Sequence, residues 1–205
     1  MPELPPWETL PEIPKPGLPG SDSEDDMHRA IGNALAGWAE LEDTLARIFY
    51  EFTASLGAVR AFGVVESFFA LRKMVQAAAI VYFGQPQSEE GLVASDGTKL
   101  SYAAVLEGYL QWCEKLASLR NNIVHGRVYR EISGTEPRVI LAPQMHDARY
   151  RLDRDKVDFK YTFADVDAFA KIFRQTPRGV EIMMANIHAR RDALRGTSQR
   201  PAEPR

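Results

Sequence analysis

The chain has 205 residues, of which 45% are hydrophobic and 26% are charged, and its formal net charge is −3. This composition is that of an ordinary soluble protein with one domain and a real core. The net charge does not mark a nucleic-acid-binding protein, and the single cysteine, Cys113, excludes an intramolecular disulfide and a cysteine-based zinc site. The charge is uneven, however. Residues 120–205 carry 17 basic and 11 acidic side chains, or +6, and residues 1–119 carry −9, which weakly favours an anionic ligand in the second part.

The N-terminal segment, residues 1–23, is rich in proline, with seven prolines among the first 20 residues. Proline has no amide donor and a fixed φ, so we expect an extended or disordered tail. Trp7, Leu10 and Ile13 could attach this tail to its own or a neighbouring subunit, although a tail without function is the simpler interpretation. No basic segment followed by an apolar run marks a secretory signal, and the apolar stretch at residues 77–83 is too short for a bilayer. We therefore expect a cytoplasmic protein without a membrane partner.

Three long helices are predicted before residue 126, because apolar residues recur there at helical spacing. The first covers residues 24–55 and begins after a cluster of serine and acidic residues, which supplies a cap and favourable first-turn charges. The second covers residues 61–83 and the third residues 100–125, with a loop rich in glycine, serine and acidic residues at 84–98. Cys113 falls near the apolar stripe of the third helix, so we expect it to be a core residue rather than a nucleophile.

Two charged residues lie on or beside these apolar faces. Glu42 is at the edge of the stripe of the first helix, where a carboxylate usually needs a cationic partner, and Arg72 or Arg120 would supply one. Arg72 itself falls on the apolar face of the second helix, which indicates a buried or interfacial ion pair. We expect both residues to support the site. A role for Glu42 as a catalytic acid is much less favoured.

After the third helix the hydrophobic pattern changes to alternation, which predicts a small antiparallel β-meander within residues 127–161. Its strands are residues 127–132 and 138–141, with further short candidates at 149–152 and 157–161. Its polar face would carry several basic residues, and a solvated sheet surface is the simpler interpretation of them.

A sequence resembling a capping box, from Thr162 to Asp165, opens a fourth helix. Pro177 and Gly179 should kink or divide this helix, the pattern continues to residue 195, and residues 196–205 should be unstructured. The fold class is therefore mainly α: one domain over residues 24–195, with four to five helices and the meander inserted after the third.

The residues that carry the most chemistry are Arg120, Asn121 and His125, at the end of the third helix. Arginine is a permanent, fork-shaped cation, and histidine can exchange a proton near neutral pH. A spacing of five residues places Arg120 and His125 about 140° apart on a continuous helix. The two residues therefore share a face only if the helix ends at the histidine. Gly126 is expected to end it in the left-handed conformation. Asn121, four residues before His125, can help to set the tautomer of the imidazole ring.

This set is sufficient for metal-free cleavage of RNA. A base must take the proton of a ribose 2′-hydroxyl, which a histidine can do, and a cation must stabilise the charge that grows on the phosphate. An arginine fork can contact two phosphate oxygens at once. No phosphate-binding loop, nucleophile elbow or His-Glu-x-x-His motif competes with this interpretation. The other histidines lie in separate segments, so neither a metal nor a cofactor is expected. A solvated arginine and a helix-capping histidine are the alternative.

The order Arg120-Asn121-Asn122-Ile123-Val124-His125, near the end of a long helix in a mainly helical chain, resembles the motif of the HEPN domains. That family comprises helical bundles, commonly dimeric, many of which are metal-independent ribonucleases in toxin–antitoxin, phage-defence and RNA-processing systems. The resemblance implies an HEPN-like bundle, a homodimer with two motifs across one cleft, an RNA substrate and a cognate antitoxin. It also implies catalytic roles for Arg120, Asn121 and His125, with Asn122 and Arg127 as substrate-binding residues. Arg127 replaces the tyrosine that one toxin subgroup has two residues after the histidine.

Two alternatives remain open. The chain could be a non-catalytic helical module that binds RNA, a nucleotide or a partner protein, in which Arg120 bonds a carboxylate such as Glu42 and His125 only caps the helix. It could also be a purely structural helical protein whose proline-rich tail makes the functional contacts.

Overall fold

The computed structural model describes residues 11–21, 23–84, 91–93, 96–132, 137–144 and 159–198. Within these ranges the chain is mainly helical, as expected, with two small antiparallel sheets. The helices are α1 (Glu24–Thr53), α2 (Leu56–Phe62), α3 (Phe68–Phe83), α4 (Tyr102–His125) and α5 (Phe163–Ser198). The strands are β1 (Gly91–Val93), β2 (Lys99–Ser101), β3 (Gly126–Glu131) and β4 (Arg138–Pro143).

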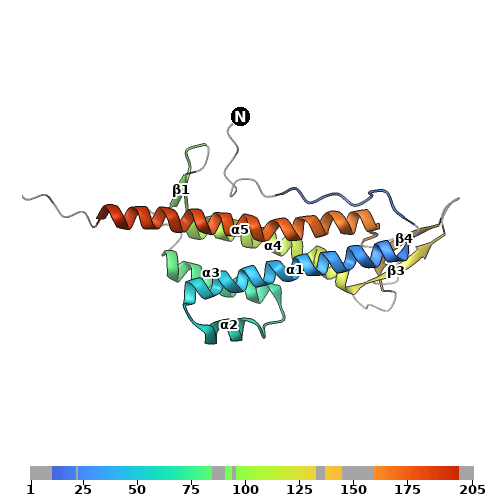
Figure 1. Ribbon diagram of the computed structural model, residues 1–205, viewed down its shortest axis with the longest axis horizontal. Helices are drawn as coiled ribbons and strands as arrows, with labels where there is room; N and C mark the ends of the chain where they lie inside the picture. Colours follow the sequence, from blue (N-terminus) through green and yellow to red (C-terminus); the bar gives the residue numbers. More distant parts are fainter. Residues whose placement is uncertain are drawn as a thin grey trace, which may run out of the picture.

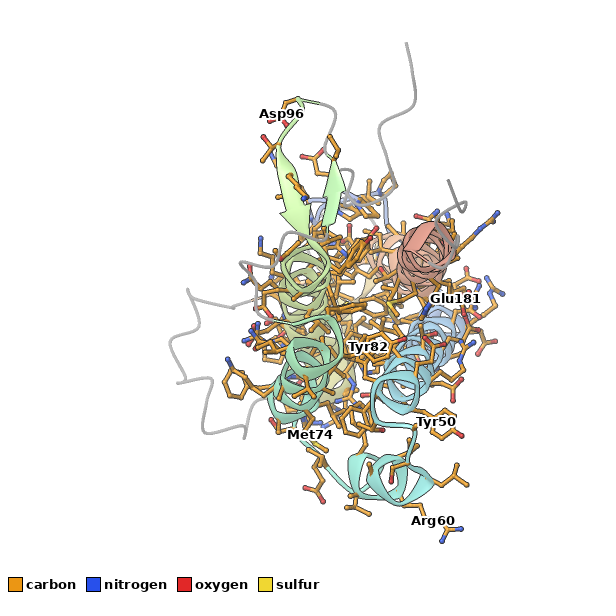
Figure 2. All side chains as sticks on the ribbon, turned by 90° about the vertical axis from the view of Figure 1, so that its left-hand side faces the viewer. Tyr50, Arg60, Met74, Tyr82, Asp96 and Glu181 are labelled. Atoms are coloured by element: carbon orange, nitrogen blue, oxygen red, sulfur yellow. The ribbon has the colours of Figure 1, made fainter. Side chains whose placement is uncertain are left out.

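The helices α1, α4 and α5 run side by side along the long axis of the molecule, with α3 beside α1 and α4 (Figure 1). Viewed along that axis, the bundle has the hairpin β1–β2 projecting on one side and α2 on the opposite side (Figure 2). Its core is made of the apolar faces of the four long helices, in which Leu41, Leu106 and Phe173 are fully buried. Burial of this apolar surface is the main force that holds the bundle together.

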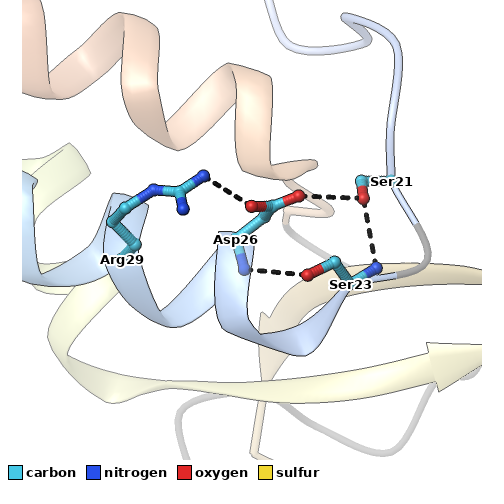
Figure 3. Close-up of polar contacts among 4 residues, drawn as sticks. All are labelled: Ser21, Ser23, Asp26 and Arg29. Atoms are coloured by element: carbon cyan, nitrogen blue, oxygen red, sulfur yellow. Dashed lines mark hydrogen bonds and ion pairs between the residues drawn. The ribbon is translucent and has the colours of Figure 1, made fainter.

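The start of α1 has the predicted cap. The Ser23 hydroxyl accepts the backbone N–H of Asp26 at 3.1 Å, and the Ser21 hydroxyl donates to the Asp26 carboxylate at 3.2 Å (Figure 3). Arg29 pairs with the other oxygen of that carboxylate. Acidic residues also occupy the first turn, where they interact favourably with the helix dipole. A local sequence signal therefore fixes this helix end.

The second predicted helix is wrong in its bounds, because two helices occupy that region. The hydroxyl of Ser55 accepts the N–H of Ala58 and so opens α2, which begins before the first residue expected to be helical and ends one residue after it. The chain then turns, and α3 begins only after Ser67. The region expected to be a loop, residues 84–98, is not only a loop. It contains strand β1, which pairs with β2 in a hairpin, and Gly97 just before β2 has a φ of +86°.

The end of α4 differs from the expectation in its backbone. The helix extends through His125 as predicted, but Gly126 has φ −73° and ψ 161°, which is extended and not left-handed. Glycine is required there for a different reason. A Cβ at Gly126 would lie 2.8 Å from the carbonyl oxygen of Asn122 and from the side chain of Leu141. β3 can therefore follow α4 directly only if residue 126 has no side chain.

The first two strands of the meander are present as expected. The strands β3 and β4 pair antiparallel from Gly126↔Pro143 to Glu131↔Arg138, close to the predicted bounds. Of the two further candidate strands, residues 149–152 lie outside the described residues. Of the other, residues 157–161, the described part from residue 159 contributes a bridge between Leu141 and Tyr161. This bridge joins the sheet to the start of α5.

The predicted capping box of α5 is present. The Asp165 carboxylate accepts the backbone N–H of Thr162 at 2.9 Å, and the Thr162 hydroxyl accepts the N–H of Asp165 at 3.2 Å. The same carboxylate accepts the N–H groups of Gly17 and Leu18, each at 3.0 Å. It therefore holds residues 11–21 against the start of α5.

α5 is one continuous helix across Pro177, so of the two expected effects, a kink or a division, the division does not occur. The neighbouring Thr176 hydroxyl donates to the carbonyl of Ile172 at 2.8 Å. No helix in the described part of the chain combines the length and the apolar character needed to cross a bilayer.

Candidate functional site

Arg120 lies in a pocket formed by α1, the start of α3 and the second half of α4. The cavity has a volume of about 280 Å³, and we call it the Arg120 pocket. Its lining combines aromatic rings, carboxylates, hydroxyls, one amide and one guanidinium: Trp38, Glu42, Glu66, Ser67, Phe68, Phe69, Glu114, Ala117, Ser118, Arg120 and Asn121. Tertiary packing therefore assembles a mixed polar and aromatic site around the first residue of the motif.

The Arg120 guanidinium has few partners among the described residues. Its Nη1 donates to the Oδ1 of the adjacent Asn121 at 3.2 Å, and its Nε is buried with no hydrogen-bond partner. None of its nitrogens lies within 4 Å of a described carboxylate, although three glutamates line the same pocket. An arginine with unused donors beside an open cavity is suited to bind an external acceptor.

Of the two supporting residues, Arg72 is paired as expected and Glu42 is not. Arg72, only 7% exposed, forms ion pairs with Glu107 at 3.0 Å and Glu114 at 3.4 Å, so its predicted buried ion pair is present. The prediction that Arg72 or Arg120 pairs with Glu42 is wrong. Its Oε1 instead accepts the indole N–H of Trp38 at 2.7 Å. An indole donor, four residues earlier on the same helix, stabilises this carboxylate without neutralising its charge.

The three catalytic candidates lie at the end of α4, but only two of them meet. Asn121 is exposed and contacts Arg120, so it does not make its predicted approach to the imidazole ring of His125. His125 is exposed and is not part of the lining of the Arg120 pocket. Because α4 is continuous through His125, the two side chains leave the helix about 140° apart and about 7.5 Å apart along its axis. A single chain does not bring the cation and the imidazole together.

The two candidate substrate-binding residues also make contacts within the chain. Asn122 is half-buried, and its Nδ2 donates to the hydroxyl oxygen of Tyr161 at 2.9 Å. Arg127 is exposed on β3, with its guanidinium carbon 5.9 Å from the centre of the Tyr129 ring. The first contact fixes the end of α4 against the segment that precedes α5. The second leaves the charge of Arg127 available to solvent.

Cys113 is fully buried, as expected of a core residue, and burial raises the pKa of its thiol to about 12. The thiol therefore stays protonated near neutral pH and is no nucleophile. Among the described side chains, no group of three or more histidine, cysteine, aspartate or glutamate residues is arranged to hold a metal ion.

Several pocket residues were missed from the sequence. Glu114 and Ser118 precede the predicted site residue Asn121 at spacings of four and three residues, which places all three on one face of α4, and this spacing could have identified the first two. Glu66 and Phe69 gave no comparable signal. They reach the pocket only because the chain turns before α3, and that turn was not predicted.

Comparisons of the chain with protein-family models, with curated proteins and with solved structures gave no match.

Proposed function

We propose that the chain is a metal-independent endoribonuclease of the HEPN type, in which the active site is completed between two copies of the chain. The observation that supports this most is the state of Arg120. Its guanidinium faces an open pocket, its Nε is buried without a partner, and no described carboxylate lies within ion-pair distance. Such a cation is ready to bind a phosphate.

In the proposed reaction the RNA provides its own nucleophile. His125 takes the proton of a ribose 2′-hydroxyl, the 2′-oxygen forms a bond to the adjacent phosphorus, and the bond to the 5′-oxygen breaks. The leaving oxygen takes a proton from an imidazolium or from water, and the product ends in a 2′,3′-cyclic phosphate. Arg120 stabilises the negative charge on the two non-bridging oxygens, and Asn121 holds the guanidinium through its Oδ1.

The separation of the two groups within one chain is the reason for proposing a dimer. An imidazole about 140° around the helix from Arg120 cannot reach the phosphate that this arginine holds. A two-fold axis beside the end of α4 would place His125 of each copy opposite Arg120 of the other. The exposed positions of Asn121, Val124 and His125 leave this surface free for such a contact.

The test is cleavage of varied RNAs by the purified protein in the presence of EDTA, with product ends identified by mass spectrometry. Wild-type protein should give 2′,3′-cyclic phosphates, and His125→Ala and Arg120→Ala should lower the rate by about 10² to 10⁴-fold. Gln111→Ala, at an exposed position on α4, is the matched control. Absence of RNA cleavage by the wild-type protein, or unchanged cleavage rates in both variants, would reject the proposed ribonuclease activity.

One observation favours a second function, that of a non-catalytic binding module. Glu42, Glu66 and Glu114 lie in the same pocket as Arg120, and their negative charge opposes the further negative charge that a phosphate gains during cleavage. In that case the pocket binds an RNA, a nucleotide or a segment of a partner protein, and His125 only ends the helix. Binding that survives His125→Ala, together with the absence of any cleavage, would support this function.

A further inference from the structure

We propose that the Arg120 pocket is a subsite for a guanine nucleotide of the RNA, in which Glu42 selects the base and Arg120 holds its phosphate. This inference rests on the proposed function for its RNA substrate, and it adds a base preference to that function. It starts from the unusual lining of the pocket, where free positive charge, free negative charge and aromatic rings face one cavity.

The charges that remain after internal pairing define the ligand. Arg72 pairs with Glu114, so that carboxylate is occupied. Glu42 and Glu66 then remain without a cation within 4 Å, and Arg120 remains without an anion, among the residues that the structure describes. A ligand that satisfies all three must carry an anion at one end and hydrogen-bond donors at the other. A nucleotide has this distribution, with its phosphate and the edge of its base.

The size and the rings of the pocket fit one base. A volume of about 280 Å³ is just below the range of small-molecule sites, which span roughly 300–1,000 Å³. Phe69 is 54% exposed and Phe68 is half-buried against Trp38, with 5.0 Å between the ring centres. Single-stranded RNA is commonly held by bases stacked on such rings and read at their Watson–Crick edges.

The carboxylates select guanine among the four bases. An ionised carboxylate only accepts hydrogen bonds, with two oxygens side by side. Guanine alone offers two adjacent donors on its Watson–Crick edge, the N1–H and the 2-amino group. Adenine and cytosine each offer one donor beside an acceptor, and uracil offers one donor between two acceptors. An acceptor that faces a carboxylate would lose a hydrogen bond and be repelled.

Glu42 is the glutamate best placed to select the base. Its Oε1 is held by the Trp38 indole N–H at 2.7 Å, and Trp38 is itself 2% exposed and packed against Phe68 and Phe173. The carboxylate is therefore held in position before any ligand arrives, which reduces the entropy lost on binding. Glu66, by contrast, is exposed and has no such support.

The experiment measures binding of mononucleotides, which the protein cannot cleave, by titration calorimetry with the full chain. GMP should bind about tenfold more tightly than AMP, and IMP, which lacks the 2-amino group, should fall between them. Glu42→Gln should remove the preference for GMP, and it keeps an oxygen that can accept the Trp38 N–H. Glu40→Gln, two residues away and exposed, should retain the preference. Arg120→Ala should weaken GMP and AMP alike, because a phosphate contact carries no base information.

The outcomes separate this inference from the nuclease proposal. Equal affinity for GMP and AMP, no measurable binding of any nucleotide, or an unchanged preference in Glu42→Gln would overturn the guanine subsite even if the protein cleaves RNA. A preference for GMP that is lost in Glu42→Gln, in a protein that cleaves no RNA, would establish the subsite and reject the nuclease.

Discussion

Asn122 donates a hydrogen bond from its side-chain amide to the hydroxyl oxygen of Tyr161 at 2.9 Å. The two residues are 39 positions apart, on α4 and on the bridge that precedes α5. Tyr161 is also paired to β4 through the backbone of Leu141, with distances of 2.8 and 2.9 Å. The contact therefore joins the helix that carries the motif to the sheet and to the start of the last helix.

We predict that Asn122→Ala lowers the free energy of unfolding by about 1 kcal/mol, because a half-buried hydrogen bond is lost and the tyrosine hydroxyl loses a donor. Asn121→Ala, at the adjacent exposed position, should change it by less than about 0.5 kcal/mol. Urea denaturation of both variants measures the difference. Equal stabilities would show that the Tyr161 contact contributes nothing.

Gly126→Ala should destabilise the protein by about 1–3 kcal/mol, the usual cost of added volume in a packed site. The backbone there is extended, so the cost comes from the 2.8 Å approach to Asn122 and Leu141 and not from φ. Gly108→Ala is the control, since nothing lies within 4 Å of its added Cβ; alanine should be neutral or stabilising inside that helix. Thermal unfolding of the two variants tests this, and a neutral Gly126→Ala would be inconsistent with the packing described.

Asp165→Ala should cost about 2 kcal/mol or more, because it removes both a helix cap and two charge-assisted hydrogen bonds. The amides of Gly17 and Leu18, which this carboxylate binds, should then exchange with solvent faster. Hydrogen exchange read by NMR is the measurement. Asp167→Ala, which breaks only a surface pair with Lys171, should leave those amides protected. Unchanged exchange in Asp165→Ala would mean that residues 11–21 are held by other contacts.

Glu131 should contribute a small pH-dependent stability. Hydrogen bonds from Lys160 and Arg138 lower its pKa below the ordinary value of 4.5. A carboxyl whose pKa is lower in the folded state stabilises the fold above the ordinary pKa, and this contribution is lost as the pH falls through the lowered value. The Glu131→Gln variant should therefore be less stable than wild type at pH 7, and the difference should shrink on acidification below 4.5. A difference that is independent of pH would contradict this assignment.

Local signals were sufficient to predict much of the fold. Ser23 and the pair Thr162 and Asp165 cap their helices as their sequence patterns indicate, because a cap depends on neighbours within one turn. The hairpin β1–β2 also has a signal, Asp96-Gly97, which is typical of tight turns, although the composition of residues 84–98 favours a loop. The extended conformation of Gly126 had none, since Gly126 is the first residue of β3 and pairs with Pro143 from a strand that is distant in sequence.

The candidate site was predictable only in part. The order of the motif residues is sufficient to identify them in the sequence. The side chains of Arg120 and His125 nevertheless point in different directions, because α4 remains helical as far as His125. The Arg120 pocket depends on how α1, α3 and α4 pack, and neither the pairing of Arg72 with Glu107 nor that of Glu42 with Trp38 has a unique sequence signal. Several glutamates were available to Arg72, and only tertiary packing selects among them.

The central claim, that Arg120 of one copy acts with His125 of another, is tested most directly by mixing two inactive variants. Arg120→Ala and His125→Ala protein should each fail to cleave RNA alone. After joint unfolding and refolding in equal amounts, half of the dimers should contain one copy of each, and each of these has one intact composite site. We predict that about a quarter of the wild-type rate returns, as two-fold symmetry requires. If both variants fold and associate normally but their mixture is as inactive as each variant alone, the proposed site shared between two copies is contradicted.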